Sequence, residues 1–151
     1  MIKNIEITES IQLLSDNYIG RLAFISAGSP YVIPVTYHYN KTNNAIISYS
    51  GVGHKIQAMR KNNTVAFEVD EITSLSNWKS VLIQGVFEEI VGTDAKYILH
   101  EFAEGVKNNI HRKKQEEHKF LPEFSSKIKT NKAPIVYQIK IIEVTGKLRY
   151  I

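Results

Sequence analysis

Apolar and polar residues alternate along most of the chain, and this pattern predicts a β-rich domain. Turn residues cluster between the apolar runs, at 28–30 and at 40–44. Because the early runs follow one another so closely, they are expected to pair as antiparallel strands. The last run gives one or two strands, with Gly146 at a turn. The predicted strands cover 21–27, 31–39, 45–50, 64–72, 78–91 and 133–151.

Three segments have the spacing of amphipathic helices instead. Apolar residues recur every three or four positions at 8–17, 55–62 and 93–106. We expect Thr8 to cap the first of these helices, and Thr93 or Asp94 to cap the third. Residues 108–133 are polar without a regular period, and they are predicted to be irregular.

Gly85 lies in the middle of the long predicted strand 78–91. A glycine at such a position often marks a bulge or a sharp bend, and a curving sheet needs one. Six or seven strands with few helices, no repeat and no linker therefore predict one β-rich (α+β) domain over 1–151, with a helical and basic insert at about 91–133. A partly closed antiparallel barrel is favoured over a sandwich.

Composition excludes several classes of protein. The 151 residues contain no cysteine, so disulfides and thiolate sites are absent, which fits a reducing cytoplasm. No apolar run approaches the roughly 20 residues that cross a bilayer, and the first residues lack a signal-peptide pattern. We therefore expect a cytoplasmic protein without membrane contact. The five histidines and the scattered carboxylates show no metal-ligand spacing.

A net charge of +4 suits a bound anion such as a phosphorylated cofactor. Part of the excess lies in the basic run at 111–119. Glu116 and Glu117 interrupt this run and would repel the phosphates of a nucleic acid. A nucleic-acid surface is thus the weakest of the functional hypotheses, and no nucleic-acid partner is expected.

The stretch "SYSGVGHKIQAMRKNN" (48–63) carries the most specific chemistry. Gly51 and Gly53 allow a close approach to the backbone, and Lys55 opens a helix whose first N–H groups favour an anion. His54 is a further donor. This order of strand, glycine loop, basic pair and helix start predicts a phosphate cradle, with an ordinary turn as the alternative. Additional hydroxyl donors come from Ser48, Tyr49 and Ser50.

Five segments in order resemble the FMN-binding split-barrel family, which includes pyridoxamine 5′-phosphate oxidase. Within that family the chain is most similar to the 5-nitroimidazole-resistance (Nim) proteins. The resemblance covers most of the chain except 91–133, and it implies a six- to seven-stranded antiparallel split β-barrel with a few flanking helices. The segments are "GRLAF" (20–24), "PYVIPVTY" (30–37), "SYSGVGHKIQAMRKNNTVAFEVD" (48–70), "WKSVLIQGVFEEI" (78–90) and "TGKLR" (145–149).

The resemblance implies an FMN site in a homodimer, with the flavins at the interface. Val35 and Thr36 would contact the polar edge of the isoalloxazine ring through their backbone. The ribityl chain and phosphate would meet the strand end 48–50 and a small–basic–basic grip. Trp78 and Ser80 would reach the flavin from the second subunit. The strand end and grip are Ser48, Tyr49, Ser50, Gly53, His54 and Lys55.

The resemblance further implies an FMN-dependent oxidoreductase, with NADH or NADPH as electron donor. A small molecule, nitroaromatic compounds included, would be the acceptor, and no catalytic side chain is nominated. One position departs from the Nim pattern, because the Nim histidine seven residues before the phosphate lysine is Ser48 here. A non-catalytic flavin-binding module is the alternative, and so is a haem-binding module with His54, His38 or His111 as ligand.

Overall fold

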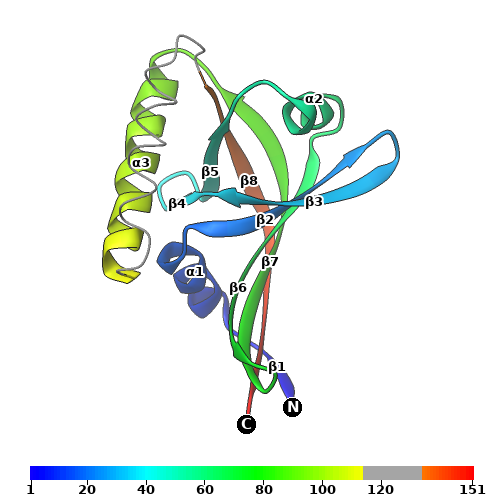
Figure 1. The fold of residues 1–151 in the computed structure, drawn as a ribbon, viewed down its shortest axis with the longest axis vertical. Coiled ribbons are helices and arrows are strands. Elements are labelled where there is room, and N and C mark those ends of the chain that lie inside the picture. Colours follow the sequence, from blue (N-terminus) through cyan, green and yellow to red (C-terminus); the bar gives the residue numbers. More distant parts are fainter. Residues whose placement is uncertain (114–133) are drawn as a thin grey trace.

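The computed structural model describes residues 1–113 and 134–151, which form eight strands and three helices (Figure 1). All strand pairs are antiparallel. The sheet order is β3-β2-β6-β7-β8-β5-β4, and β1 pairs with β8. The elements are β1 (Ile2–Asn4), α1 (Ile7–Asp16), β2 (Ile19–Ser26), β3 (Ser29–Thr36), β4 (His38–Asn40), β5 (Ala45–Ser50), α2 (His54–Lys61), β6 (Thr64–Ser74), β7 (Asn77–Ile90), α3 (Thr93–Lys113) and β8 (Ile135–Tyr150).

The sheet curls into a half-barrel. β3 and β4 stand at opposite ends of the strand order, yet only Tyr37 separates them in the chain, so the sheet must bend back on itself. Between β3 and β5 no strand pairing closes the ring within the described residues, and this gap is the split of the barrel. Ser48 Oγ crosses it to donate a hydrogen bond to the Thr36 carbonyl, at 2.7 Å. The predicted antiparallel split barrel is confirmed.

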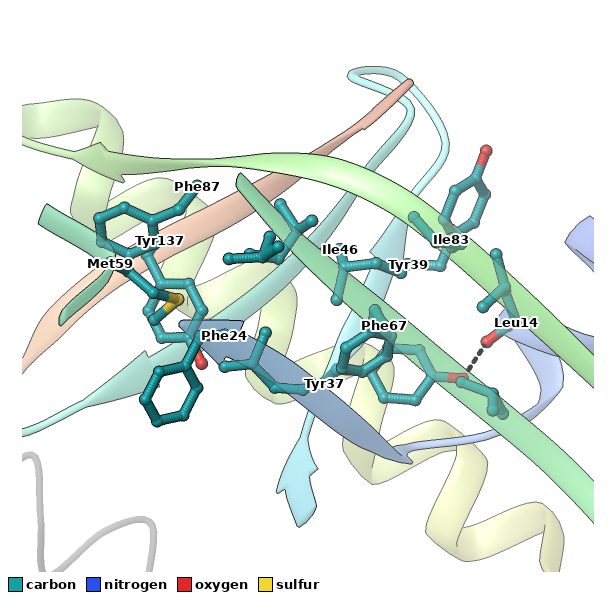
Figure 2. Packing of buried hydrophobic residues seen from close by; sticks show 14 of the residues in the cluster. Leu14, Phe24, Tyr37, Tyr39, Ile46, Met59, Phe67, Ile83, Phe87 and Tyr137 are labelled. Carbon is teal, nitrogen blue, oxygen red and sulfur yellow. Dashed lines mark hydrogen bonds between the residues drawn. The ribbon is translucent and has the colours of Figure 1, made fainter. Parts of the chain in front are cut away.

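The main core fills the concave side of the sheet (Figure 2). Alternation on β6 turns Val65, Phe67 and Val69 inward, as period-two patterning requires. Apolar residues of α1 and α2 pack against this cluster from opposite ends of the half-barrel (Figure 1). Its largest fully buried members include Leu14, Tyr37, Ile56, Met59, Phe67, Ile83, Tyr137 and Ile139.

A second cluster lies outside the half-barrel, where α3 covers β5 and β8. Ile98, Phe102, Val106 and Ile110 recur every fourth residue and are buried against these strands. The periodicity continues to Lys113, so the prediction of irregular structure from residue 108 onward is wrong for 108–113. The remaining part of that segment, 114–133, lies outside the described residues.

The two predictions for strand glycines have opposite outcomes. At Gly85 the pairing of β7 with β8 shifts register, and a Cβ there would lie 2.7 Å from the Lys140 carbonyl oxygen, so the predicted bulge is confirmed. Gly146, by contrast, is not at a turn: β8 runs unbroken from Ile135 to Tyr150. A Cβ at Gly146 would lie 2.4 Å from Ser10 Oγ, so this glycine lets α1 pack closely on β8.

Two smaller expectations also change. The turn expected at 28–30 is centred on Ala27 and Gly28, whose φ angles of 50° and 80° fit a tight hairpin turn. Helix α1 begins at Ile7 after Glu6, so Thr8 lies inside the first turn and is not its cap. Over 1–113 and 134–151, none of the helices combines the length and the apolar character that a membrane span requires.

Candidate functional site

A pocket of about 170 Å³ lies at the split of the barrel, beside the first turn of α2; we call it the split pocket. Five of the ten residues predicted to bind the cofactor line it. They come from three separate elements, and Lys55 brings the only formal charge among the lining residues. An anion is therefore the electrostatically favoured occupant. The lining residues are Pro34, Val35, Thr36, Ser48, Tyr49 and Lys55.

The first turn of α2 adds backbone N–H groups that no intrahelical bond uses. Gly53 is the N-cap and has no side chain with which to cap the helix. The first intrahelical hydrogen bond runs from Gln57 N to Gly53 O, at 3.0 Å, which leaves the preceding N–H groups outside the helical pattern. A Cβ at Gly51 or Gly53 would meet no atom within 4 Å. Open glycines, the N–H groups of a helix start and a lysine together fit a phosphate group.

β3 supplies backbone groups to the same place. Among the described strands it pairs with β2 alone, so its other edge faces the split. An antiparallel edge strand presents N–H and C=O groups that no strand partner uses, and of these the Thr36 carbonyl already accepts from Ser48. This geometry suits the predicted backbone contacts of Val35 and Thr36 with the polar edge of a flat ring.

The hydroxyl groups predicted as donors face their own main chain. Ser48 is buried and donates to Thr36 O, while Ser50 Oγ donates to Gly51 O at 2.9 Å. The Tyr49 ring packs edge-on against Phe102 of α3, with 5.2 Å between ring centroids. The sequence could not show the packing of Tyr49, because that packing depends on which side of β5 is covered by α3.

His54 and Lys55 face different pockets. His54 Nε2 lies 2.9 Å from Ser26 Oγ, and its ring is edge-on to Tyr31 with 5.0 Å between centroids. Successive helical residues point about 100° apart, which separates the two side chains. His54 lines a pocket of about 350 Å³ that we call the hairpin pocket, between α2 and the β2–β3 turn. Its lining residues are Ile25, Ser26, Ala27, Gly28, His54, Gln57, Ala58, Lys61 and Asn62.

Trp78 and Ser80 lie far from the split pocket within one chain. Val81 and Ile83 of β7 are buried in the core, so their neighbours Ser80 and Leu82 face the convex outer side of the sheet. Trp78 follows the β6–β7 turn directly, and Figure 1 shows that turn and α2 at opposite ends of the molecule. One chain alone does not bring the ten predicted residues together.

The sequence analysis missed a charged cluster on the outer side of β2 and β6. Arg21 Nη1 lies 3.2 Å from Asp70 Oδ2 and 3.7 Å from Glu68 Oε1. Burial raises the pKa of Glu68 to about 7; the hydrogen bond and charge of Asp70 add to this shift, and Arg21 opposes it. The available signal was the pair of carboxylates two residues apart on a strand whose alternate residues are apolar.

It also missed Tyr137, which pairs with Ser48 across β5 and β8. Its hydroxyl is buried and makes no well-oriented hydrogen bond within 1–113 and 134–151. Burial raises the pKa of Tyr137 to about 12, and the nearby Ser48 hydroxyl opposes the shift without forming such a bond. A tyrosine in an alternating strand gives no sequence signal that its hydroxyl will lack a partner.

Comparison with known proteins places this geometry in context. The family model of pyridoxamine 5′-phosphate oxidase matches residues 6–148. An uncharacterised protein of Rhizobium meliloti is 35% identical over 75 residues, which are 50% of this chain and 48% of that protein. This match thus spans about half of each chain.

Solved structures extend the likeness over nearly the whole chain. An FAD-binding protein from Mesorhizobium loti is 25% identical with a TM-score of 0.75, covering 98% of this chain and 96% of that one. A candidate 5-nitroimidazole antibiotic resistance protein from Bacteroides thetaiotaomicron is 16% identical with a TM-score of 0.67, over 98% and 89%. An FAD and haem binding protein from Mycobacterium smegmatis is 15% identical with a TM-score of 0.68, over 98% and 73%. The last two show the shared fold.

Proposed function

Since the chain belongs to the pyridoxamine 5′-phosphate oxidase family, we propose that it is a flavin-dependent oxidoreductase. Its cofactor is FMN, or the FMN portion of a larger flavin. NADH or NADPH supplies the electrons, and a small molecule accepts them. The single observation that carries the proposal is the split pocket, which Lys55 at the start of α2 lines. The open glycines Gly51 and Gly53 lie in the loop that leads from β5 into this helix.

The chain's own residues bind and orient the cofactor. Lys55 and the first N–H groups of α2 would hold the phosphate, and the unpaired edge of β3 would offer backbone groups to the ring. The split pocket measures about 170 Å³, below the roughly 300 Å³ at which ligand sites begin. A pocket of this size would enclose only part of a flavin. When bound, the flavin supplies hydride transfer, and no acid or base of the protein is assigned to that step.

The relatives support a flavin more than a particular acceptor. The Mesorhizobium loti protein is an FAD-binding protein at 25% identity over almost the full length of both chains. At the position of the Nim histidine, Ser48 is 3% exposed and bonded to Thr36 O, so it presents no imidazole to an acceptor. We accordingly assign small aromatic or nitro compounds only as a class, without nitroimidazole specificity.

A homodimer completes the site in this proposal. Trp78 and Ser80 lie at the far end of one chain, and a two-fold partner would bring its own copies to the exposed ring. Apolar side chains on the outer side of the sheet support such an interface: Val32 is 65% exposed, Ile72 68% and Leu82 42%. Light scattering of the flavin-loaded protein should give the mass of two 17.2 kDa chains. The mass of one chain would remove Trp78 and Ser80 from the site.

The decisive experiment is a visible spectrum of the protein after FMN is added and the excess is removed on a desalting column. We expect retained flavin absorbance, and we expect Lys55→Ala to lower the affinity by about tenfold or more, as loss of a charge-assisted hydrogen bond does. Lys96→Ala, an exposed lysine in the first turn of α3, is the matched control. A protein that lets both FMN and FAD pass through would contradict the proposal.

Turnover separates the enzyme from a non-catalytic flavin-binding module. Steady-state oxidation of NADH or NADPH by the loaded protein is expected, and its absence with every small acceptor would favour the module. Haem is less favoured because two of its candidate ligands already contact protein groups. His54 bonds Ser26, and His38 Nε2 lies 3.6 Å from Glu101 Oε1. A Soret band on haem titration would reverse that preference.

A further inference from the structure

A groove of about 660 Å³ lies at the end of the molecule where β1, the β6–β7 turn and the last residues of β8 come together (Figure 1); we call it the terminal groove. It is larger than the split pocket and the hairpin pocket, and its volume falls within the range of ligand sites. We propose that the terminal groove binds an aromatic carboxylate, at a site distinct from the split pocket.

Strand register places six of the lining residues in two rows on one face of the sheet. Lys79 of β7 pairs with Leu148 of β8, which pairs in turn with Lys3 of β1. Asn77 pairs with Tyr150, two residues along each strand, and this pair starts the second row. Residues two apart on a strand point to the same side, and the core lies on this side of β7. The rows consist of Met1, Lys3, Asn77, Lys79, Leu148 and Tyr150.

The other lining residues stand beside and between these rows. Glu9 of α1 holds Lys79, with 2.9 Å between Oε1 and Nζ. Trp78 and Arg149 occupy the strand positions between the rows. The Nε atom of Arg149 is buried and has no hydrogen-bond partner within residues 1–113 and 134–151. A second basic group near the groove is therefore left without a counter-charge.

The terminal groove has an excess of positive charge. Among its lining residues Lys3, Lys79 and Arg149 are basic, and Glu9 is the one carboxylate. Lys79 already uses that carboxylate, and Lys3 forms no ion pair with the described part of the chain. An anion is thus the favoured occupant.

The source of this charge favours a carboxylate over a phosphate. At this end of the sheet β7 pairs with β6 and β8, and β8 pairs with β7 and β1. Their backbone N–H groups are therefore used within the sheet, and they do not converge as a phosphate cradle requires. A single side-chain ammonium group, that of Lys3, matches the single charge of a carboxylate.

The apolar side chains of the rows favour an aromatic body. Tyr150 is 71% exposed and Met1 is 82% exposed, so the chain itself leaves both largely uncovered. A flat ring placed over them would remove apolar surface from water, and the Tyr150 ring offers it an aromatic contact. Leu148 lies between Lys3 and Lys79 in the first row. An acid group at Lys3 with its ring over Leu148 and Tyr150 fits this arrangement.

The test is isothermal titration calorimetry of the full chain with 1-naphthoate. The probes 1-naphthalenemethanol and 1-naphthylmethylammonium carry the same ring with a neutral and a positive group. We expect 1-naphthoate to bind about fivefold more tightly than the alcohol, since its ion pair forms at an exposed lysine, and the cation to bind more weakly than the alcohol. Raising the ionic strength from about 0.05 M to about 0.5 M should weaken the acid and not the alcohol.

Variants locate the binding. Lys3→Ala should weaken 1-naphthoate about fivefold and leave the alcohol within about twofold, and Lys3→Arg should keep the affinity for the acid. Tyr150→Ala should weaken all three probes by about threefold, because it removes the ring contact. Both side chains are exposed, so the fold should survive, which far-UV circular dichroism checks.

Two lysines provide matched controls. Lys147 is exposed and pairs with Ser80, so it lies on the opposite face of β8 from the groove. Lys147→Ala should leave the affinity for 1-naphthoate unchanged, and so should Lys55→Ala in the split pocket. Equal binding of the acid and the cation, equal losses with Lys3→Ala and Lys147→Ala, or no binding of any probe would each overturn the proposal. A loss with Lys55→Ala alone would also overturn it, because the acid would then occupy the split pocket.

Discussion

The glycines at the two ends of the half-barrel have opposite surroundings. At the α1 end the chain's own atoms occupy the space beside each glycine: a Cβ at Gly20 would lie 2.4 Å from Phe67 Cζ, and one at Gly146 would lie 2.4 Å from Ser10 Oγ. At the α2 end a Cβ at Gly51 or Gly53 would meet no atom within 4 Å. The fold requires the first pair of glycines. No packing contact in the described chain requires the second pair, and such open space is what the proposed phosphate site needs.

Buried hydroxyl groups are divided differently between the two ends. At the α1 end Tyr37 donates to the carbonyl of Leu14 at 2.7 Å, which satisfies an acceptor that the end of the helix leaves open (Figure 2). Toward the α2 end, the Tyr137 hydroxyl has no well-oriented partner among the described residues. At the α1 end, however, the buried Ser10 Oγ also lacks a hydrogen-bond partner among the described residues. The contrast between the two ends therefore lies in the space beside their glycines and not in their hydroxyl groups.

Substituting one glycine at each end tests this contrast most strongly. Gly20→Ala should lower the free energy of unfolding by about 3 kcal/mol, because the added Cβ meets a buried ring and overpacking of a core costs energy. Phe67 is 1% exposed and edge-on to Tyr37, so its ring has little room to move. Urea unfolding followed by circular dichroism gives the difference.

Gly51→Ala is the matched change at the α2 end. It should leave the free energy of unfolding within about 0.5 kcal/mol of the unaltered protein, since the Cβ enters open space on an exposed loop. The same variant should bind flavin less tightly in a fluorescence titration. Unaltered flavin affinity would show that the open space at Gly51 is not used by the cofactor, and equal destabilisation by both variants would abolish the contrast between the ends.

The sequence predicted the scaffold because its signals are local. Alternation in Val65, Phe67 and Val69 places one face of β6 in the core, and a strand has only two faces. Gly85 indicated a bulge because glycine weakens the interior of a strand and is typically found there where the backbone bends. The cradle was predicted for a similar reason, as glycines before a basic helix start form a short contiguous pattern.

What the sequence could not predict depends on tertiary contacts. From the sequence, the neighbours His54 and Lys55 form one basic pair. In the fold the rings of Phe24 and Tyr31 pack against the His54 imidazole, and this packing directs the imidazole to the hairpin pocket. Gly146 suggested a turn in the sequence, and only the fold shows that Ser10 of α1 lies against it. The end of α3 is similar, because Arg112 binds the carbonyl of Asp16 and thereby extends a helix whose polar residues suggested a loop.

The free energy of unfolding should respond differently when Tyr37 and Tyr137 are each replaced by phenylalanine, and this difference is smaller than that between the glycines. Tyr37→Phe should lower the free energy of unfolding by about 1.5 kcal/mol, because it removes a buried hydrogen bond and leaves the Leu14 carbonyl without this donor. Tyr137→Phe should change the free energy of unfolding by less than about 0.5 kcal/mol, since its hydroxyl has only the Ser48 hydroxyl beside it and no well-oriented hydrogen bond. Parallel urea titrations of the two variants measure both. Equal losses would mean that the Tyr137 hydroxyl has a partner in solution.

The carboxyl pair of Glu68 and Asp70 on the outer side of the sheet is only partly neutralised by Arg21. Its effect on stability is expected to be the smallest of those considered. The pKa of Glu68 is about 7 in the folded chain, against an ordinary value of 4.5. Between these pH values the native state holds a proton that the unfolded chain has released. The stabilising contribution is therefore complete below about pH 4.5 and is lost as the pH rises toward 7. Because Glu68 is 33% exposed, solvent screening keeps the change small.

Glu68→Gln keeps the shape of the side chain and removes its titration. Thermal melts of both proteins between pH 4.5 and pH 8 should show the variant gaining stability relative to the unaltered chain as the pH rises, with the difference levelling above about pH 7. Glu104→Gln, an exposed change on α3, should leave the two melting curves parallel at every pH. If Glu68→Gln also gave parallel curves, the Glu68 carboxyl would not hold its proton more tightly in the folded chain than in the unfolded one, and the cluster with Arg21 would make no pH-dependent contribution to stability.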